Sequence, residues 1–310
     1  RGFESLRLRH FYNEVIFLNC DAMFRLFALL LGTFVLSACT GSAYQLPQLT
    51  SSEVRAMEEK ISSNDKPMKT YRRSDAYYKN ALAAITKRLS RNAKPLCEDS
   101  GYTQCHFEVT YNPDMTVNAY ASKGYKVVIY KGLLQYLANS DEMAAVVAHE
   151  MGHHLAKHNE ETERNAAAGA AISGILTAVV LGAANANNAY YSSYQQRQDQ
   201  QTIGNMMQFG AYMGVMSYSK EQEREADLLA TYLLSRSGYN LQRAQNVMVV
   251  LARFAGEEAE NPTHKAFLES HPAGAERIVA WQKAIDEIKT NTSKLPYPKK
   301  QPQAVKQKSE

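Results

Sequence analysis

The sequence predicts an α+β fold that is mostly helical, with a small β-sheet beside a central helix. Three short stretches of alternating apolar and polar residues lie between positions 106 and 130, and helix-like segments dominate afterwards. Strands that cluster before helices favour this class over a wound parallel sheet. The chain has 310 residues, 45% of them apolar, with no visible repeat, so one sizeable core is expected.

The N-terminus has the pattern of a bacterial lipoprotein signal. From Met23, "MFRLFALLLGTFVLSAC" has a basic start, a short apolar run and small residues before Cys39, the expected lipidated residue. Thr40 resembles an outer-membrane sorting signal. A membrane-anchor helix is the alternative, but the run is short for a span. Residues 1–22 are interpreted as an upstream extension.

Cys97 and Cys105 are the cysteines that remain for the folded region, because Cys20 precedes the expected start and Cys39 carries lipid. In an oxidising compartment these two can pair. The segment "CEDSGYTQC" suits a loop closed before the first strand. Before this loop we expect a helix over "SDAYYKNALAAITKRLS". After it we expect three strands, over "HFEVTY", "VNAYAS" and "KVVIY".

The next element is a buried helix over "NSDEMAAVVAHEMGHH", with Asn139 as its N-cap and Glu142 three residues later. On this helix His149 and His153 share one face. The pattern H-E-x-x-H gives a zinc ion two imidazoles and leaves Glu150 as general base.

His154 and His158 form a second pair on another face of the same helix. Leu155 follows the first of them, and the sequence becomes strongly polar around the second. We interpret both as solvated, or as partners of ligand residues.

Residues 166–184 are uncharged and rich in Ala and Gly. The segment could nearly span a bilayer, but a single span would separate the site residues on its two sides. A close-packed helix or a mobile hairpin beside the active site is the preferred interpretation.

An amphipathic helix over "SYSKEQEREADLLATYLL" places Glu223 and Asp227 on one face. Glu223 is a candidate third zinc ligand, and Asp227 could hold the N–H of a ligand imidazole. Glu221 and Glu225, on the same helix, are interpreted as ordinary surface charges. Two further helices are expected around "SHPAGAER".

These motifs resemble the zinc metallopeptidase family that includes HtpX, the CAAX prenyl endopeptidases, BepA and LoiP. The resemblance covers roughly residues 70–285 and also rests on "NAY" and "SHPAGAERI". It implies a zincin (gluzincin) fold with one zinc ion per chain. The implied ligands are His149, His153 and Glu223, with Glu150 as the base and Asp227 orienting a ligand histidine.

The resemblance also implies roles for two outlying motifs. It places Asn118, Ala119 and Tyr120 near a sheet edge that could hold substrate as an added strand, although an ordinary buried strand remains open. It brings His271 and Arg277 to the cleft. There His271 would either donate to the oxyanion or occupy the open position of zinc in a resting state.

The domain division follows from these assignments. Residues 1–38 are the extension and signal, 39–70 a tether, 71–290 the zinc peptidase domain and 291–310 a disordered basic tail. The last twenty residues hold five lysines and one glutamate, a net charge of +4, which equals the formal net charge of the whole chain. No basic stripe with interleaved aromatics supports nucleic-acid binding.

The sequence therefore predicts a zinc endopeptidase that is lipid-anchored at the periplasmic face of the outer membrane. It would hydrolyse unfolded or misassembled envelope proteins. The alternative is an envelope chaperone or assembly factor with a structural or latent zinc site.

Overall fold

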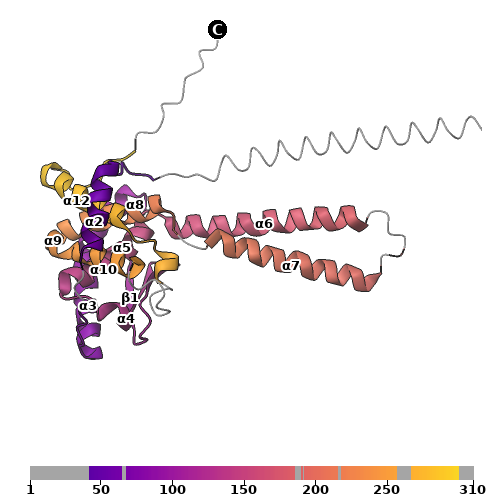
Figure 1. Cartoon of the computed structure of the whole chain (residues 1–310), viewed down its shortest axis with the longest axis horizontal. Coiled ribbons are helices and arrows are strands. Elements are labelled where there is room, and N and C mark those ends of the chain that lie inside the picture. The colour runs from indigo at the N-terminus through magenta and orange to yellow at the C-terminus, as the bar shows by residue number, and fades with distance from the viewer. Residues whose placement is uncertain are drawn as a thin grey trace, which may run out of the picture. The chain divides into compact units, whose positions relative to one another are not determined.

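The computed structural model describes residues 42–64, 68–185, 190, 192–215, 218–256 and 267–299 (Figure 1). The expected signal segment, Cys39 and residues 300–310 lie outside this part of the chain. Within it, a small sheet accompanies a mostly helical core, so the predicted α+β class is confirmed.

The sheet has three strands in the order β1-β3-β2. Strand β3 (Lys126–Tyr130) pairs in parallel with β1 (Glu108–Asn112) and antiparallel with β2 (Ala119–Ser122). Val127 and Ile129 of the central strand are fully buried, which explains their alternation with more exposed neighbours. Strand β2 is therefore an edge of this sheet, and it packs against α5.

Helix α5 (Ser140–Leu155) is the centre of the core and carries the H-E-x-x-H motif. The side chain of Asn139 accepts hydrogen bonds from the backbone N–H groups of Asp141 and Glu142, which confirms the predicted N-cap. Helix α3 (Asp75–Asp99) packs against α5 and extends past the predicted end, because Ala93 and Leu96 continue its buried face.

Helix α8 (Lys220–Arg236) crosses α5 at close range. The contact is at Gly152, where an added Cβ would lie 2.5 Å from the backbone oxygen of Ala226. Only glycine permits this approach without displacing α8. It brings the carboxylates of α8 to the histidines of α5.

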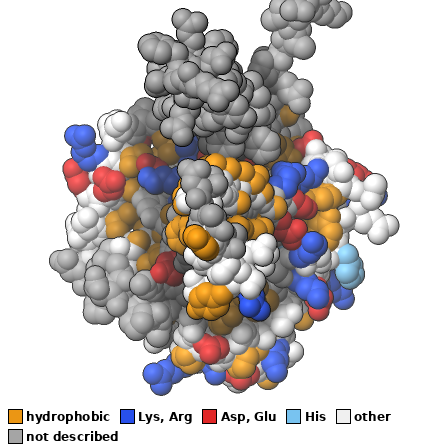
Figure 2. All heavy atoms as spheres, turned by 90° about the vertical axis from the view of Figure 1, so that its right-hand side faces the viewer, with side chains coloured by type: hydrophobic (Ala, Val, Ile, Leu, Met, Phe, Trp, Pro, Cys, Tyr) orange, Lys and Arg blue, Asp and Glu red, His pale blue; other side chains and the backbone are white. Residues whose placement is uncertain are grey.

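Helices α6 (His158–Asn185) and α7 (Ser193–Val215) lie side by side as a hairpin (Figure 1). Gly174 of α6 is buried against α7, while the opposite face of α6 exposes a stripe of large apolar side chains: Ile172, Ile175, Leu176, Val179 and Val180. Figure 2 faces the side toward which the hairpin extends in Figure 1 and shows hydrophobic side chains near its centre.

Of the two forms expected for residues 166–184, a close-packed helix or a mobile hairpin, the structure has a helical hairpin, in which α6 packs against α7 and most of its other side chains are exposed. Its composition hid this outcome, since a sequence shows which residues are apolar but not what covers them. Among the described residues, α6 is also the helix long and apolar enough to cross a membrane.

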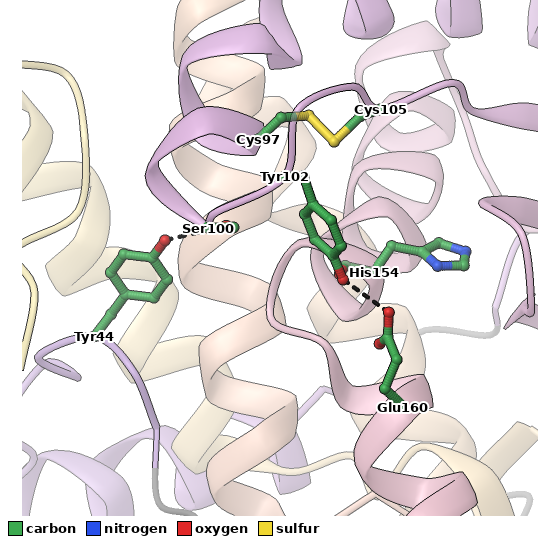
Figure 3. The surroundings of a disulfide bond; sticks show 7 residues. All are labelled: Tyr44, Cys97, Ser100, Tyr102, Cys105, His154 and Glu160. Carbon is green, nitrogen blue, oxygen red and sulfur yellow. Dashed lines mark hydrogen bonds between the residues drawn. A yellow bond between two sulfur atoms is a disulfide. The ribbon is translucent and has the colours of Figure 1, made fainter.

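A disulfide joins Cys97, in the last turn of α3, to Cys105 before β1 (Figure 3). The loop between them carries Tyr102, whose hydroxyl donates to the backbone oxygen of His154 and to the Glu160 carboxylate. The bridge therefore supports a loop that contacts the turn between α5 and α6.

The helices that complete the core are α2 (Ser51–Ser62), α4 (Lys131–Leu134), α9 (Leu241–Ala244), α10 (Asn246–Gly256) and α12 (Ala275–Thr290). Helix α2 packs on α12, and a salt bridge of 2.8 Å joins Glu53 to Lys283. Part of the expected tether of residues 39–70 is thus a helix held on the domain.

Residues 291–299 differ from the expected disordered tail. Asn291 is buried, and the backbone N–H of Gln45 donates to the oxygen of Tyr297. An isolated bridge pairs Tyr44 with Pro298. The Lys- and Pro-rich composition concealed these few specific contacts, so the predicted start of the tail at 291 is too early.

Candidate metal centre

Four buried side chains converge between α5, α8 and the segment that precedes α12. They are His149, His153, Glu223 and His271, and one potential ligand atom from each lies within 4.8 Å of the others. The Nε2 atoms of His149 and His153 are 3.0 Å apart. The Oε1 atom of Glu223 lies 3.3 Å from Nε2 of His153. The structure therefore brings together the three predicted ligands with His271.

The second ring nitrogen of His149 is held by Asp227. Nδ1 of His149 lies 2.8 Å from Oδ1 of Asp227, one helical turn beyond Glu223 on α8. Arg277, predicted to approach the cleft, is buried and donates through Nε and Nη2 to the two Asp227 oxygens. Its Nη1 lies 2.5 Å from Glu223 Oε2, so one guanidinium fixes both carboxylates.

His153 is contacted at its other ring nitrogen by His158. The two Nδ1 atoms are 3.0 Å apart, and His158 begins α6 directly after Lys157, whose φ is +62°. This left-handed residue reverses the chain after α5 and returns His158 to the centre. The suggestion that His158 is solvated is wrong, whereas the suggestion of a ligand partner agrees with this geometry.

His154 is also buried, but it faces away from the cluster. Its Nε2 lies 3.2 Å from the backbone oxygen of Lys126 in β3, and its Nδ1 lies 3.1 Å from the amide of Asn159. Its ring also lies against Tyr125 and Phe107. His154 thus joins the sheet to α5, so it is not solvated either.

Glu150 is fully buried beside the cluster. Neither of its carboxylate oxygens has a hydrogen-bond partner among the described residues, and His271 Nε2 lies 3.7 Å from Oε1. Burial raises the pKa of Glu150, opposed by the nearby His271 and His149 rings. A buried carboxylate without hydrogen bonds is costly, and such groups concentrate at functional sites.

Burial also governs the imidazoles. It lowers the pKa of His153 well below its usual value, which favours the neutral form that binds metals. For His149 burial acts in the same direction, but Glu223 and Asp227 outweigh it and raise the pKa to about 9. Burial would raise the pKa values of Glu223 and Asp227, yet Arg277 overcomes it and lowers both.

Two aromatic residues at the centre were missed by sequence reasoning. Tyr218 stacks on His153 with ring centroids 3.8 Å apart and donates its hydroxyl to Asn159. Phe267 stacks on His271 at 4.9 Å. Tyr218 lies just before the N-cap Ser219 of α8, a position that fixes its location but carries no periodic pattern.

The predicted substrate residues lie on and beside the edge strand β2. Ala119 is fully buried, Tyr120 is exposed, and the backbone oxygen of Asn118 accepts from Tyr130. In the described part of the chain β2 pairs only with β3, so its other edge has no strand partner there, and β2 packs on the metal-site helix α5.

Comparison with known proteins identifies related sequences. The model of peptidase family M48 matches residues 83–285. The mitochondrial metalloendopeptidase OMA1 of Saccharomyces cerevisiae is 28% identical over 171 residues, or 55% of this chain and 44% of that protein. The beta-barrel assembly-enhancing protease of Yersinia pestis is 29% identical over 214 residues, or 67% and 39%. The chain thus matches about half or less of the length of these two relatives.

Proposed function

The chain belongs to peptidase family M48. We propose that it is a zinc metalloendopeptidase that acts on unfolded or misassembled envelope proteins. The observation that carries this proposal is the buried cluster of His149, His153 and Glu223 beside the carboxylate of Glu150, which accepts no hydrogen bond from the described residues.

The donor set fits a zinc ion. Two imidazoles and one carboxylate are the ligand types of catalytic zinc sites, and they leave a position free. Nε2 of His149 and of His153 point at one centre, while their Nδ1 atoms are engaged by Asp227 and His158. Such outer contacts hold ligand histidines in place.

The chemistry divides between the ion and the protein. Bound zinc supplies a Lewis acid that polarises a peptide carbonyl and acidifies water. Glu150, whose pKa is raised by burial, accepts the proton of the attacking water and then delivers it to the leaving amine. Arg277 positions Glu223 and Asp227 through its ion pairs.

His271 offers a fourth ring to the same centre. Its Nδ1 lies 3.0 Å from Glu223 Oε1 and 3.4 Å from His149 Nε2. This position supports a resting state in which His271 occupies the open site and is displaced by substrate. We favour this role over oxyanion donation, because His271 lies among the ligand atoms.

Substrate selection is proposed to use the edge of β2. An unfolded segment could add to this edge as a strand, with backbone hydrogen bonds that tolerate many sequences. Asn118, Ala119 and Tyr120 would form this binding edge. Folded proteins have few free extended segments, so this mode favours unfolded ones.

The proposed location is the periplasmic face of the outer membrane, with a lipid anchor on Cys39. The lipoprotein-like segment before Cys39 and the Cys97–Cys105 disulfide support an oxidising envelope compartment. The name of the beta-barrel assembly-enhancing protease also supports this setting, whereas the name of OMA1 refers to mitochondria.

A chaperone or assembly factor with a latent zinc site is the second candidate. It is favoured by His271, which lies among the candidate ligand atoms, and by the exposed apolar stripe of α6. Such a protein would bind unfolded chains without cutting them.

Cleavage of a β-barrel protein compared in its unfolded and folded forms tests the proposal. The zinc-loaded protein should cleave the unfolded form, spare the folded form, lose activity with a chelator and regain it with zinc. Prevention of aggregation without cleavage would favour the chaperone instead.

A further inference from the structure

Glu225 of α8 joins the metal centre to the N-terminal segment of the described chain. The sequence predicts an ordinary surface charge at Glu225, yet its side chain is almost completely buried. One carboxylate oxygen, Oε2, lies 3.1 Å from Nε2 of His158. The other, Oε1, accepts hydrogen bonds from the backbone N–H groups of Ala43 and Tyr44. We call residues 42–44 the N-terminal strap.

The strap is held from several sides. Glu221 of α8 accepts from the N–H of Ser42 at 3.0 Å, and the backbone N–H of Lys299 donates to the oxygen of Ala43. The hydroxyl of Tyr44 reaches the end of α3, where it lies 3.2 Å from the Ser100 hydroxyl (Figure 3). It also donates to the Asp99 carboxylate. The two backbone donors that face Glu225 are therefore fixed in position.

These contacts determine which nitrogen of each ring carries hydrogen. A carboxylate only accepts, so Nε2 of neutral His158 must be the N–H that donates to Glu225. Nδ1 of His158 then has a free lone pair and accepts from Nδ1–H of His153, 3.0 Å away. His153 is left with an unprotonated Nε2, which points at His149 and Glu223. A metal ligand requires this tautomer.

We propose that Glu225 and His158 are positioning residues that set the tautomer of His153, and that the strap fixes the orientation of Glu225. The inference rests on the proposed function only in taking His153 as a metal ligand. His153 is thus oriented by a carboxylate through a second histidine, whereas His149 contacts the Asp227 carboxylate directly.

Replacement of Glu225 by Gln or Ala distinguishes this role from simple packing. In Glu225→Gln, the amide oxygen must face the two fixed N–H donors of the strap, so its NH₂ group faces His158. This NH₂ group donates to Nε2 of His158, which reverses the direction of the hydrogen bonds. Nδ1 of His158 then carries the hydrogen and donates to His153, so His153 adopts the tautomer with hydrogen on Nε2. In Glu225→Ala no side chain at position 225 selects a tautomer, so His158 can adopt either one. Gln should therefore weaken zinc binding more than Ala, although Gln fills the space better.

Zinc affinity is measured by chelator competition on purified, folded full-length protein. We expect Glu225→Gln to bind Zn²⁺ about 10- to 100-fold more weakly than wild type, the range for partners of ligand histidines. Glu221→Gln is the matched control, because Glu221 contacts the strap but no histidine. It should keep wild-type affinity. Equal affinity of Glu225→Gln and wild type, or weaker binding by Ala than by Gln, would overturn the proposal.

Ring ¹⁵N chemical shifts test the tautomer directly. In metal-free wild-type protein His158 should be protonated at Nε2 and not at Nδ1, and in metal-free Glu225→Gln these two nitrogens should exchange roles. Protonation of His158 at Nδ1 in the wild type would overturn the proposal. If wild-type protein instead binds no zinc at all, the proposed function fails, and the shifts of the metal-free protein still decide the tautomer.

Discussion

Nδ1 of His149 lies 2.8 Å from Oδ1 of Asp227, and Arg277 donates hydrogen bonds to both oxygens of that carboxylate. Asp227 is thus the link between a candidate ligand on α5 and a fixed cation on α12. Its carboxylate favours the tautomer of His149 whose Nε2 is free for metal.

Asp227→Ala should weaken zinc affinity by about 10- to 100-fold while the fold is retained. Chelator titration of the purified variant measures this. Thr231→Ala is the control, because Thr231 lies buried on the same helix and its hydroxyl donates to the backbone oxygen of Asp227. Unchanged zinc retention in Asp227→Ala would contradict the assigned contact.

His271→Ala should raise basal turnover with zinc still bound, because the ring that fills the open position is removed. Peptide cleavage rates and zinc content are measured on the same samples, with Ser270→Ala as the control for the loop. A fall in turnover with unchanged zinc would instead assign His271 to oxyanion donation, and wild-type turnover would leave it neither role.

Gly152→Ala should destabilise the protein by about 1–3 kcal/mol, the usual cost of overpacking. The added methyl group would lie 2.5 Å from the oxygen of Ala226 and push α8 from α5. Zinc affinity should fall as well, since the ligands lie on both helices. Gly182→Ala is the matched control: nothing lies within 4 Å of its Cβ, so it should be neutral or slightly stabilising. Thermal melts of both variants decide the comparison.

Loss of the disulfide should reduce stability by about 2–3 kcal/mol, because the bridge closes a loop between cysteines eight positions apart. The double variant Cys97→Ser, Cys105→Ser is compared with wild type in denaturant unfolding. Alkylation before and after reduction, read by mass spectrometry, should label these thiols only after reduction. Labelling without reductant in envelope-derived protein would contradict the pairing.

The sequence was most informative where chemistry is encoded locally. The H-E-x-x-H spacing, the N-cap Asn139 and the four-residue step from Glu223 to Asp227 are properties of single helices, so they could be read without a fold. The three strands were located for the same reason, by alternation.

Contacts that depend on tertiary packing were not predictable in this way. Tyr218 stacks on His153 and Glu225 reaches His158 only because α8 crosses α5 at Gly152. The exposure of α6 depends on what lies beside it, which composition does not encode. Resemblance to a family supplied His271 and Arg277, since no local pattern links them to α5.

Zinc content and casein cleavage of Glu150→Gln, measured together, show whether Glu150 is the general base of a zinc endopeptidase. Gln keeps the size of Glu150 but cannot accept the proton of water. We expect one zinc ion per chain, an unchanged melting temperature and a loss of turnover of about 10²–10⁴-fold. Undiminished casein cleavage by the zinc-loaded variant would contradict the role of Glu150 as the base.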